Sequence, residues 1–415
     1  MDLARQLLES CRDGRDWSVS LLDRLVAQAT DKDPAVALAA SRSLFTDLVE
    51  PLADAFEPAF CDAYARLFAR VIATVVPELD AGGLLDRYRR IRRPRQWQGD
   101  ASAVRRVAVL SRVTLGADVA VTSVFLDAAK KRFPHAEVCF AGGPKGWELF
   151  AADPRLRHLP VPYGRGASLA DKLGVWPELK RRLSEPASIV MDPDSRLTQL
   201  GLLPVCGEEN YFFFESRAWG GESDAPLGEL ARHWLAEVFG VEDAEPFIAP
   251  PETPPETMTF GGQPVITASL GVGENQAKRV ADPFEEELVR HLANKDALVI
   301  LDQGPGGEEA QRVGRVVAAC GAQAGRIQVH EGSFASFAAR IARSRLYVGY
   351  DSAGQHVAAA CGVPLVAVFA GHVSPRMFAR WRPRGRGPSE VVRVENQDPA
   401  EVFRMSQAAI DRLWR

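Results

Sequence analysis

A short polar segment between two apolar runs carries the most concentrated chemistry in the sequence. "DSAGQH", residues 351–356, follows "RLYVGY", which has the β-branched and aromatic content of a buried strand, and precedes the Ala-rich run "VAAAC". That run stops at Gly362 and Pro364, as helices do, and "LVAVFAG" has the composition of another buried strand. The pattern predicts a β-α-β unit. Its polar turn would lie at the carboxyl end of a strand, where open parallel sheets bind ligands.

This turn has the features of an anion site. A helix that begins after Ser352 presents unpaired backbone amides and the positive end of its dipole, and a diphosphate fits such a helix start. The small residues Ala353 and Gly354 would let a ligand approach the backbone, while Gln355 and His356 could donate hydrogen bonds to its oxygens. The plainer alternative is a capping side chain followed by an interior histidine.

The composition limits what this unit can belong to. A chain of 415 residues is too long for one core, so we expect two or three domains. Hydrophobic residues make up 46% and charged residues 25%, which is typical of globular proteins, and a net charge of −4 gives no general attraction to nucleic acid. The start of the chain does not resemble a signal peptide, and no apolar run approaches the roughly 20 residues of a membrane span. The six scattered cysteines have neither zinc-site nor disulfide spacing, so we expect free thiols and a cytoplasmic protein.

Residues 1–97 are predicted to be wholly helical. Two long segments, at 33–56 and 57–76, repeat apolar residues at helical spacing, and each begins with an acidic residue followed by proline. The block ends in an arginine cluster at positions 87, 89, 90, 92, 93 and 95. The cluster is interpreted either as a solvated helix end and linker or as a grip on a phosphorylated partner or a membrane surface. The block as a whole could serve oligomerisation or partner binding.

From residue 104 onward the pattern alternates between strands and helices, in two sets that resemble each other in order. The proline-rich "IAPPETPPET" at 248–257 separates the sets and is typical of a semi-rigid linker. The predicted fold class is therefore α/β, with two Rossmann-like domains that face each other across a cleft and an all-helical block before them. The predicted boundaries are 1–97 for the helical block, 98–250 for the first Rossmann-like domain, 251–257 for the linker, 258–400 for the second domain and 401–415 for a final helix.

The opening segment resembles the signature of glycosyltransferase family 9, the ADP-heptose:lipopolysaccharide heptosyltransferases. In "YDSAGQHVAAACGVPLVAVFAG" the family's acidic, serine, histidine, glycine and proline positions are occupied by Asp351, Ser352, His356, Gly362 and Pro364. The sequence departs from the family at position 353, where an alanine replaces the usual glycine.

Two further segments resemble the same family, so that the resemblance covers roughly 104–400. "ITASLGVGENQAKRVADPF" is similar to a strand, a glycine turn and a basic pair, which is Lys278 and Arg279 here. "VAVLSRVTLGADVAVTSVFL" is similar to the family's D-V-x-x-T segment, with Asp118 and Thr122 in place and the glycine shifted by one position to Gly116. The resemblance implies a GT-B type fold with an acceptor domain, a donor domain and a final helix that packs back on the first domain.

The resemblance also implies roles for individual residues. Asp118 would be the general base on the acceptor hydroxyl, and Lys278 would stabilise the departing nucleoside diphosphate without a metal ion. The donor would contact the loops after the strands of the second half, namely Gly271, Gly273, Asn275, Lys278, Arg279, Gln303, Gly304, Asp351, Ser352, Ala353, Gly354, Gln355 and His356. The acceptor would contact Gly116 and Thr122 together with Asp194, Ser195 and Arg196 of "IVMDPDSRLTQLG". Metal binding by this Asp-x-Asp is the less favoured interpretation of that segment.

The sequence therefore predicts a metal-independent, inverting glycosyltransferase that uses no cofactor. Its donor would be a nucleotide-diphosphate sugar such as ADP-heptose, and its acceptor an envelope glycan, glycolipid or protein, with peripheral membrane contact as an option. A nicotinamide-dependent dehydrogenase is disfavoured because no G-x-G-x-x-G follows a strand. A sugar-nucleotide epimerase on the same fold and a degenerate, non-catalytic scaffold remain as alternatives.

Overall fold

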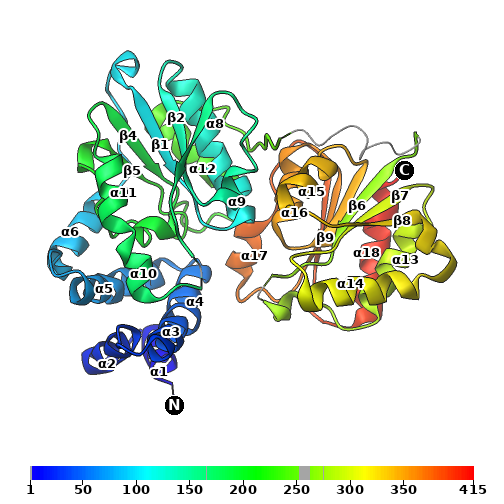
Figure 1. The fold of residues 1–415 in the computed structure, drawn as a ribbon, viewed down its shortest axis with the longest axis horizontal. Coiled ribbons are helices and arrows are strands. Elements are labelled where there is room, and N and C mark those ends of the chain that lie inside the picture. The colour runs from blue at the N-terminus through cyan, green and yellow to red at the C-terminus, as the bar shows by residue number, and fades with distance from the viewer. Residues whose placement is uncertain (1, 165, 252–261, 274) are drawn as a thin grey trace.

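The chain forms a helical block and two α/β lobes, which Figure 1 shows from one side. The coordinates are a computed structural model that describes residues 2–164, 166–251, 262–273 and 275–415. The two lobes stand side by side, and the helical block extends from the first lobe (Figure 1). The predicted α/β fold of two Rossmann-like domains is confirmed. Most of the predicted linker, residues 251–257, lies outside the described residues.

The helical block is built from short amphipathic helices, several of them capped by an acidic residue that precedes the first turn. Asp33 accepts a hydrogen bond from the Ala35 amide, and Asp80 accepts one from the Gly83 amide. Its elements are α1 (Leu3–Arg12), α2 (Val19–Ala29), α3 (Pro34–Arg42), a π-helical turn (Ser43–Val49), α4 (Glu50–Asp54), α5 (Pro58–Val75) and α6 (Ala81–Ile91).

The first lobe is a parallel sheet of five strands in the order β3-β2-β1-β4-β5. Its strands are β1 (Arg106–Leu110), β2 (Glu137–Gly142), β3 (Leu156–Pro160), β4 (Ser188–Asp192) and β5 (Tyr211–Phe213). Its helices are α7 (Leu115–Ala117), a π-helical turn (Asp118–Thr122), α8 (Ser123–Arg132), α9 (Pro144–Trp147), α10 (Leu169–Gly174), α11 (Trp176–Leu183) and α12 (Leu227–Phe239).

The second lobe is a parallel sheet of six strands in the order β11-β10-β9-β6-β7-β8. Its strands are β6 (Val265–Ser269), β7 (Leu298–Asp302), β8 (Ile327–His330), β9 (Leu346–Tyr350), β10 (Leu365–Phe369) and β11 (Ser389–Arg393). Its helices are α13 (Phe284–Ala293), α14 (Gly307–Ala319), α15 (Phe334–Ile341), α16 (Ala353–Ala360), α17 (Pro375–Trp381) and α18 (Pro399–Leu413).

The strand order of each sheet fixes where a ligand can enter. The order reverses between β1 and β4 in the first lobe and between β6 and β9 in the second. At such a switch point the connections leave the sheet in opposite directions and open a crevice outside the carboxyl ends of the strands. The polar segments singled out in the sequence follow β1, β6 and β9, so the fold itself brings them to the two crevices.

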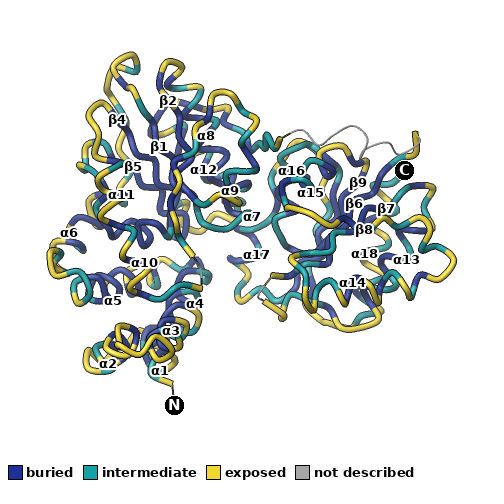
Figure 2. Tube along the Cα trace, in the orientation of Figure 1, coloured by how far each residue is buried: buried dark blue, intermediate teal, exposed yellow. Residues whose placement is uncertain are grey.

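The helical block covers one face of the first sheet and is not a free-standing unit. Side chains alternate across β1, so that Ala108 and Leu110 share a core with α1 to α6, whereas Val107 and Val109 face α8 and α12. The central strands of both sheets are buried, whereas the edge strands β3, β8 and β11 carry exposed and half-buried residues (Figure 2).

The arginine cluster at the end of the block fastens the block to the first lobe. Arg87 is buried, donates to the Gly201 carbonyl at 2.7 Å and lies over the Tyr211 ring. Arg92 donates to the buried carboxylate of Glu215 at 2.7 Å. The interpretations as a solvated linker and as a grip on a phosphorylated partner or membrane are thus wrong for Arg87 and Arg92, because both guanidinium groups bind groups of the first lobe.

The last helix does not return to the first lobe, which corrects the prediction for residues 401–415. Helix α18 packs on α13, β10 and β11 of its own lobe, with Asp411 paired to Lys295 and hydrogen-bonded to His291. The chain crosses earlier, at α17 and the loop after it. Arg380 donates to the carbonyls of Ala225 and Gly221, and Arg384 pairs with Glu229 and Glu245, all in the first lobe. The domain boundaries themselves stay predictions.

Candidate active site

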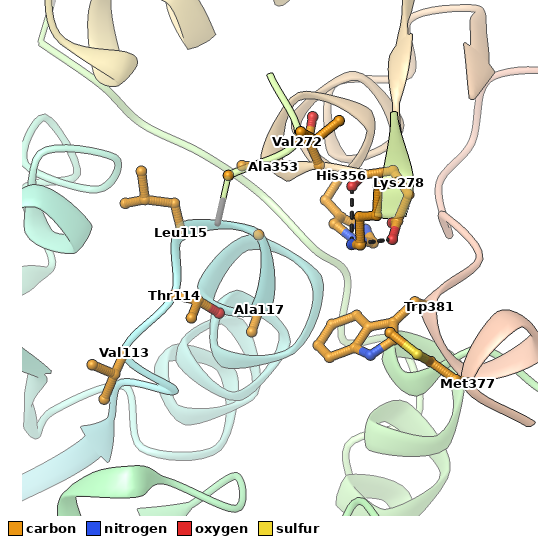
Figure 3. Close-up of a pocket in the computed structure, with 14 residues that line it drawn as sticks. Val113, Thr114, Leu115, Ala117, Val272, Lys278, Ala353, His356, Met377 and Trp381 are labelled. Carbon is orange, nitrogen blue, oxygen red and sulfur yellow. Dashed lines mark hydrogen bonds and ion pairs between the residues drawn. The ribbon is translucent and has the colours of Figure 1, made fainter. Parts of the chain in front are cut away.

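A cavity of about 450 Å³ lies between the two lobes, and Figure 3 shows the residues that line it. The first lobe contributes the loop that follows β1. The second lobe contributes the loop after β6, the start of α16 and one side of α17. The lining residues are Val113, Thr114, Leu115, Gly116, Ala117, Val272, Gly273, Lys278, Asp351, Ser352, Ala353, His356, Met377 and Trp381. The cavity therefore joins the two crevices that the strand orders create.

The start of α16 opens into this cavity. Ser352 is the residue before the first turn, and its side chain does not cap the helix. Ala353, the first helical residue, also lines the cavity. The first amides of α16, which have no partner within the helix, therefore point toward a space where an anion can bind them. This is the arrangement that the sequence predicted for the turn.

Lys278 stands beside the helix start. Its Nζ lies 2.6 Å from Oδ2 of Asp351 and 3.2 Å from the Asp351 carbonyl oxygen. The lysine reaches this position because Gly371, after β10, lets the loop that carries it approach closely. A Cβ at Gly371 would lie 2.8 Å from the Lys278 amide nitrogen, and its φ of +67° is in the region that favours glycine. A positive charge is thus held next to the open amides.

His356 borders the cavity as a neutral side chain. It is buried, and burial lowers the pKa of its imidazole to about 4. At neutral pH the ring therefore contributes hydrogen bonding and shape but no charge. The fixed positive charge on this side of the cavity comes from Lys278.

The loop after β1 forms the opposite wall and touches α16. A Cβ on Gly116 would lie 3.3 Å from the Cα of Ala353, so the glycine permits the two backbones to approach. Val113 adopts a φ of +72°, a strained conformation for a β-branched residue. Strain of this kind persists only where the surroundings enforce it, and it is common at functional sites.

Asp118 lies behind this loop, in an adjoining cavity of about 300 Å³. Val113 and Leu115 line both cavities. Asp118 lies one turn into a helix and not at its start: α7 begins at Leu115, and the Asp118 amide donates to the Thr114 carbonyl at 2.8 Å. Asp118 therefore faces the donor cavity across a thin wall and does not open directly into it.

The carboxylate of Asp118 is buried and held by neutral donors. Ser111 Oγ donates to Oδ2 at 2.7 Å, while the Arg112 amide and Thr122 Oγ1 donate to Oδ1 at 2.7 and 2.8 Å. Burial raises the pKa of Asp118 to about 6, and the hydrogen bonds oppose that rise. Since a carboxylate accepts about four hydrogen bonds, one position on Oδ2 is left for another group. A Cβ at Gly146 would lie 3.0 Å from Oδ2, so this glycine keeps the space beside the oxygen open.

Several predicted donor contacts lie away from the cavity. Arg279 pairs with Glu285 and Asp282, and Asn275 borders a different cavity, between the helical block and the second lobe. Gly271 and Gly304 do not line the donor cavity. The Glu309 side chain lies beside both, 2.6 Å from each of their Cβ positions. Gln303, beside Gly304, likewise does not line the cavity.

Two residues of the α16 segment point into the protein. A Cβ at Gly354 would lie 2.2 Å from Oη of Tyr347, so this glycine serves close packing against the strand. Gln355 is fully buried and donates to Asp351 and, at 3.4 Å, to the Trp381 carbonyl. The predicted ligand contacts of Gly354 and Gln355 are therefore wrong, because the helix turns these two positions away from the cavity.

Most of the predicted acceptor residues are internal. Thr122 is buried and positions Asp118. Asp194 pairs with Arg217 at 2.9 Å, and Ser195 donates to the Ser111 carbonyl, so both are used within the lobe. Arg196 differs: it is only partly buried, and its buried Nη1 has no hydrogen-bond partner among the described residues. Within the described ranges, no group of three His, Cys, Asp or Glu side chains could hold a metal ion.

Sequence reasoning missed α17, which supplies Met377 and Trp381 to the cavity. The segment "SPRMFARW" does carry a helix signal, because Ser374 caps the first turn and Pro375 follows it. Nothing in the order of its residues, however, shows which face meets the cleft.

The comparisons with known proteins agree with this architecture. Residues 229–402 match the model of glycosyltransferase family 9 (heptosyltransferase). Over these residues the chain is similar to that family. The resemblance predicted over roughly 104–400 is thereby confirmed for 229–402, and the match indicates a glycosyltransferase. No curated protein sequence matches the chain.

Solved structures share the fold over both lobes. The family 9 glycosyltransferase of Veillonella parvula DSM 2008 is 18% identical with a TM-score of 0.55, covering 74% of this chain and 97% of the other. E. coli heptosyltransferase WaaC with ADP is 14% identical with a TM-score of 0.53, covering 74% and 98%. E. coli ADP-heptose LPS heptosyltransferase II is 17% identical with a TM-score of 0.51, covering 75% and 100%. At these identities the likeness establishes the fold. Among the described residues, no helix is long and apolar enough to cross a bilayer.

Proposed function

We propose that this chain is an inverting, metal-independent glycosyltransferase that moves a sugar from a nucleotide-diphosphate donor to a hydroxyl of an envelope glycan, glycolipid or protein. One observation carries the proposal: the open start of α16 and Lys278 line one cavity, and a buried aspartate with a raised pKa lines the next. The anion-binding surface and the proton acceptor are thus separated only by the loop that follows β1.

The donor diphosphate would lie on the first amides of α16. These amides and Lys278 can take up the negative charge that grows on the phosphate oxygens as the leaving group departs. Asp351 holds Lys278 in place through its 2.6 Å contact, which orients the ammonium group before the donor binds. Of the predicted donor residues, Gly273, Lys278, Asp351, Ser352, Ala353 and His356 keep this role.

The acceptor hydroxyl would lie in the Asp118 cavity, on the vacant side of Oδ2. Its oxygen attacks the anomeric carbon from the face opposite the phosphate, its proton passes to Asp118, and the anomeric C–O bond to the phosphate breaks with its electron pair on the nucleoside diphosphate. A pKa of about 6 suits this step, because the carboxylate is ionised at neutral pH and still basic enough to accept a proton. Gly116, which lines the donor cavity, and Arg196, whose Nη1 has no hydrogen-bond partner among the described residues, keep a proposed role in acceptor binding.

Binding and turnover can be tested separately. We expect a thermal-shift and calorimetric screen of ADP-, GDP-, UDP- and dTDP-sugars to identify one donor, beginning with ADP because a structural neighbour was solved with it. Transfer should then persist in EDTA and give a product of inverted anomeric configuration by NMR. Donor that is isomerised without any acceptor would point to an epimerase, and donor binding without turnover on glycan, glycolipid and protein acceptors would point to a scaffold. The six free cysteines suit the reducing cytoplasm, the proposed compartment.

A further inference from the structure

Three consecutive residues of the helical block, Ala55, Phe56 and Glu57, contact helix α17, which lines the candidate active site. The Ala55 carbonyl accepts a hydrogen bond from Ser374 Oγ at 3.3 Å, at the residue that caps α17. The Phe56 ring meets the Trp381 ring edge to face, with the centroids 6.2 Å apart and the planes at 80°. Glu57 lies 4.0 Å from the guanidinium of Arg376. Residues 55–57 therefore contact α17 along its whole length, from the first turn to the last.

Phe56 makes this contact in a strained conformation. Its φ is +58°, in the left-handed region that bulky residues avoid, yet its side chain is only 2% exposed. A conformation of this kind persists only where surrounding contacts enforce it. The ring belongs to the core that joins the two lobes, whereas most of its helical block shares a core with the first sheet. The strain thus places one aromatic ring of the block against the wall of the active site.

Trp381 is the point where the three parts of the molecule meet. It lines the donor cavity, opposite the loop that carries Ala117 (Figure 3). Its ring centroid lies 5.9 Å from that of His356 in the second lobe and 5.9 Å from the guanidinium carbon of Arg112 in the first. Phe56 adds the contact from the helical block. Arg112 also supplies the backbone amide that holds Asp118, so Trp381 borders both the anion-binding side and the base side.

We propose that Trp381 forms the wall against which the transferred sugar packs, and that Phe56 is a positioning residue that holds this wall. The inference rests on the proposed function. In that reaction the sugar must lie between the diphosphate on α16 and the acceptor hydroxyl near Asp118, which is where Trp381 lies. An indole face suits the apolar C–H face of a sugar ring. The helical block is then part of the catalytic unit, and its separate role in oligomerisation or partner binding stays a prediction.

The test compares the affinity for a nucleoside diphosphate with the affinity for the matching nucleotide sugar. Calorimetry gives the Kd of ADP and the Kd of ADP-heptose, or of the pair that the donor screen selects. The ratio of the nucleotide Kd to the nucleotide-sugar Kd reports how much the sugar contributes to binding. We expect Trp381→Ala and Phe56→Ala each to lower this ratio about tenfold, a loss in the range of one aromatic contact, while affinity for the nucleotide alone stays within about twofold. The conservative variants Trp381→Phe and Phe56→Tyr should recover most of the ratio.

Two further variants separate positioning from stability. Phe56→Gly removes the same ring but relieves the strained φ, so it should be more stable than Phe56→Ala and should show the same fall in the ratio. Phe60→Ala removes another aromatic ring of the same block, four residues on, for which the structure shows no contact with Trp381, and it should leave the ratio unchanged.

The outcomes are distinguishable. If Phe56→Gly keeps the wild-type ratio, or if nucleotide and nucleotide sugar lose affinity equally, the positioning role is overturned and the proposed function stands. If the wild-type protein binds neither ligand of any donor pair, the proposed function fails and the inference fails with it.

Discussion

Each lobe places an aspartate after a strand at the switch point of its sheet, and the two lobes use this aspartate in opposite ways. Asp351 directly follows β9 and is paired with a cation, Lys278, at 2.6 Å. Asp118 follows β1, is surrounded by three neutral donors, and has a pKa raised by burial to about 6. One carboxylate orients a positive charge, and the other is poised to accept a proton. Similar strand-turn-helix units therefore acquire different chemistry from the groups that surround the carboxylate.

The strongest test of this contrast is removal of the proposed base. We expect Asp118→Asn to lower transfer about 10³-fold, within the range for loss of a general base, and to leave calorimetric binding of the donor nucleotide unchanged. The amide keeps the shape of the side chain but cannot take the hydroxyl proton. Asp192→Asn, a second buried aspartate whose pKa is also raised to about 6 but which lies in neither cavity, is the matched control. Equal activity of Asp118→Asn and wild type would remove the base assignment.

The second lobe is tested by removal of the positive charge of Lys278. Lys278→Met should lower the turnover number about 10²-fold, because a fixed positive charge near the leaving phosphate stabilises the transition state more than the bound donor. Arg279→Met, one residue on but paired with Glu285 and Asp282, should have a far smaller effect. Steady-state kinetics with saturating donor measure both variants. A loss confined to the KM would show that Lys278 binds the donor without assisting its departure.

The space beside Asp118 can be filled without touching the carboxylate. Gly146→Ala places a methyl group 3.0 Å from Oδ2, on the side proposed for the acceptor hydroxyl, and 2.9 Å from Cζ of the Phe140 ring, which must shift slightly. We expect about a tenfold fall in transfer, in the range for misplacement of a reacting group, with the nucleotide affinity unchanged. Gly143→Ala, in the same cavity but with open space at its Cβ position, should be nearly silent. Similar losses in both variants would mean that the cavity does not admit the acceptor.

The raised pKa of Asp118 gives the reaction a pH dependence. The base must be deprotonated, so activity should rise with pH through about 6 and level off above 7. At pH 5 we expect about one tenth of the plateau rate. The rate under conditions that report kcat/KM, measured from pH 5 to 8, checks this. A profile that is flat across this range would contradict the assignment of Asp118.

The smallest expected effect concerns stability and His356. Its pKa is lowered to about 4 in the folded protein, below the value of 6.5 for an unperturbed histidine. The unfolded state therefore binds more protons between these values, so the folded state loses stability as the pH falls from 6.5 toward 4. At pH 5 this single group should cost about 2 kcal/mol relative to pH 7.5. Urea unfolding at both pH values should show a smaller change for His356→Gln, and an equal change would refute the assignment.

The sequence predicted the fold well because strands, turns and helices each depend on local patterns of residue type. The alternation of short apolar runs with helical segments predicted two α/β domains, and each contains a parallel sheet. Ala353, predicted to let a ligand approach the backbone, lines the cavity, whereas Gly354 packs against Tyr347. The turn after β9 and Lys278 could be placed at one site because the carboxyl ends of neighbouring parallel strands meet at one edge. The directions of Gln355 and Arg279 could not be inferred, because the motif fixes their positions along the chain but not the groups that compete for them.

By itself the sequence determined the alternation of strands and helices in two sets and the polar turns at which a ligand could bind. Tertiary structure alone decided that the arginine cluster fastens the helical block, that α18 stays on its own lobe, and that Trp381 joins all three parts of the molecule. The physical reason is that periodicity encodes which face of an element is buried. Which distant surface covers that face depends on the packing of the whole chain, and so does the pKa of a carboxylate such as Asp118.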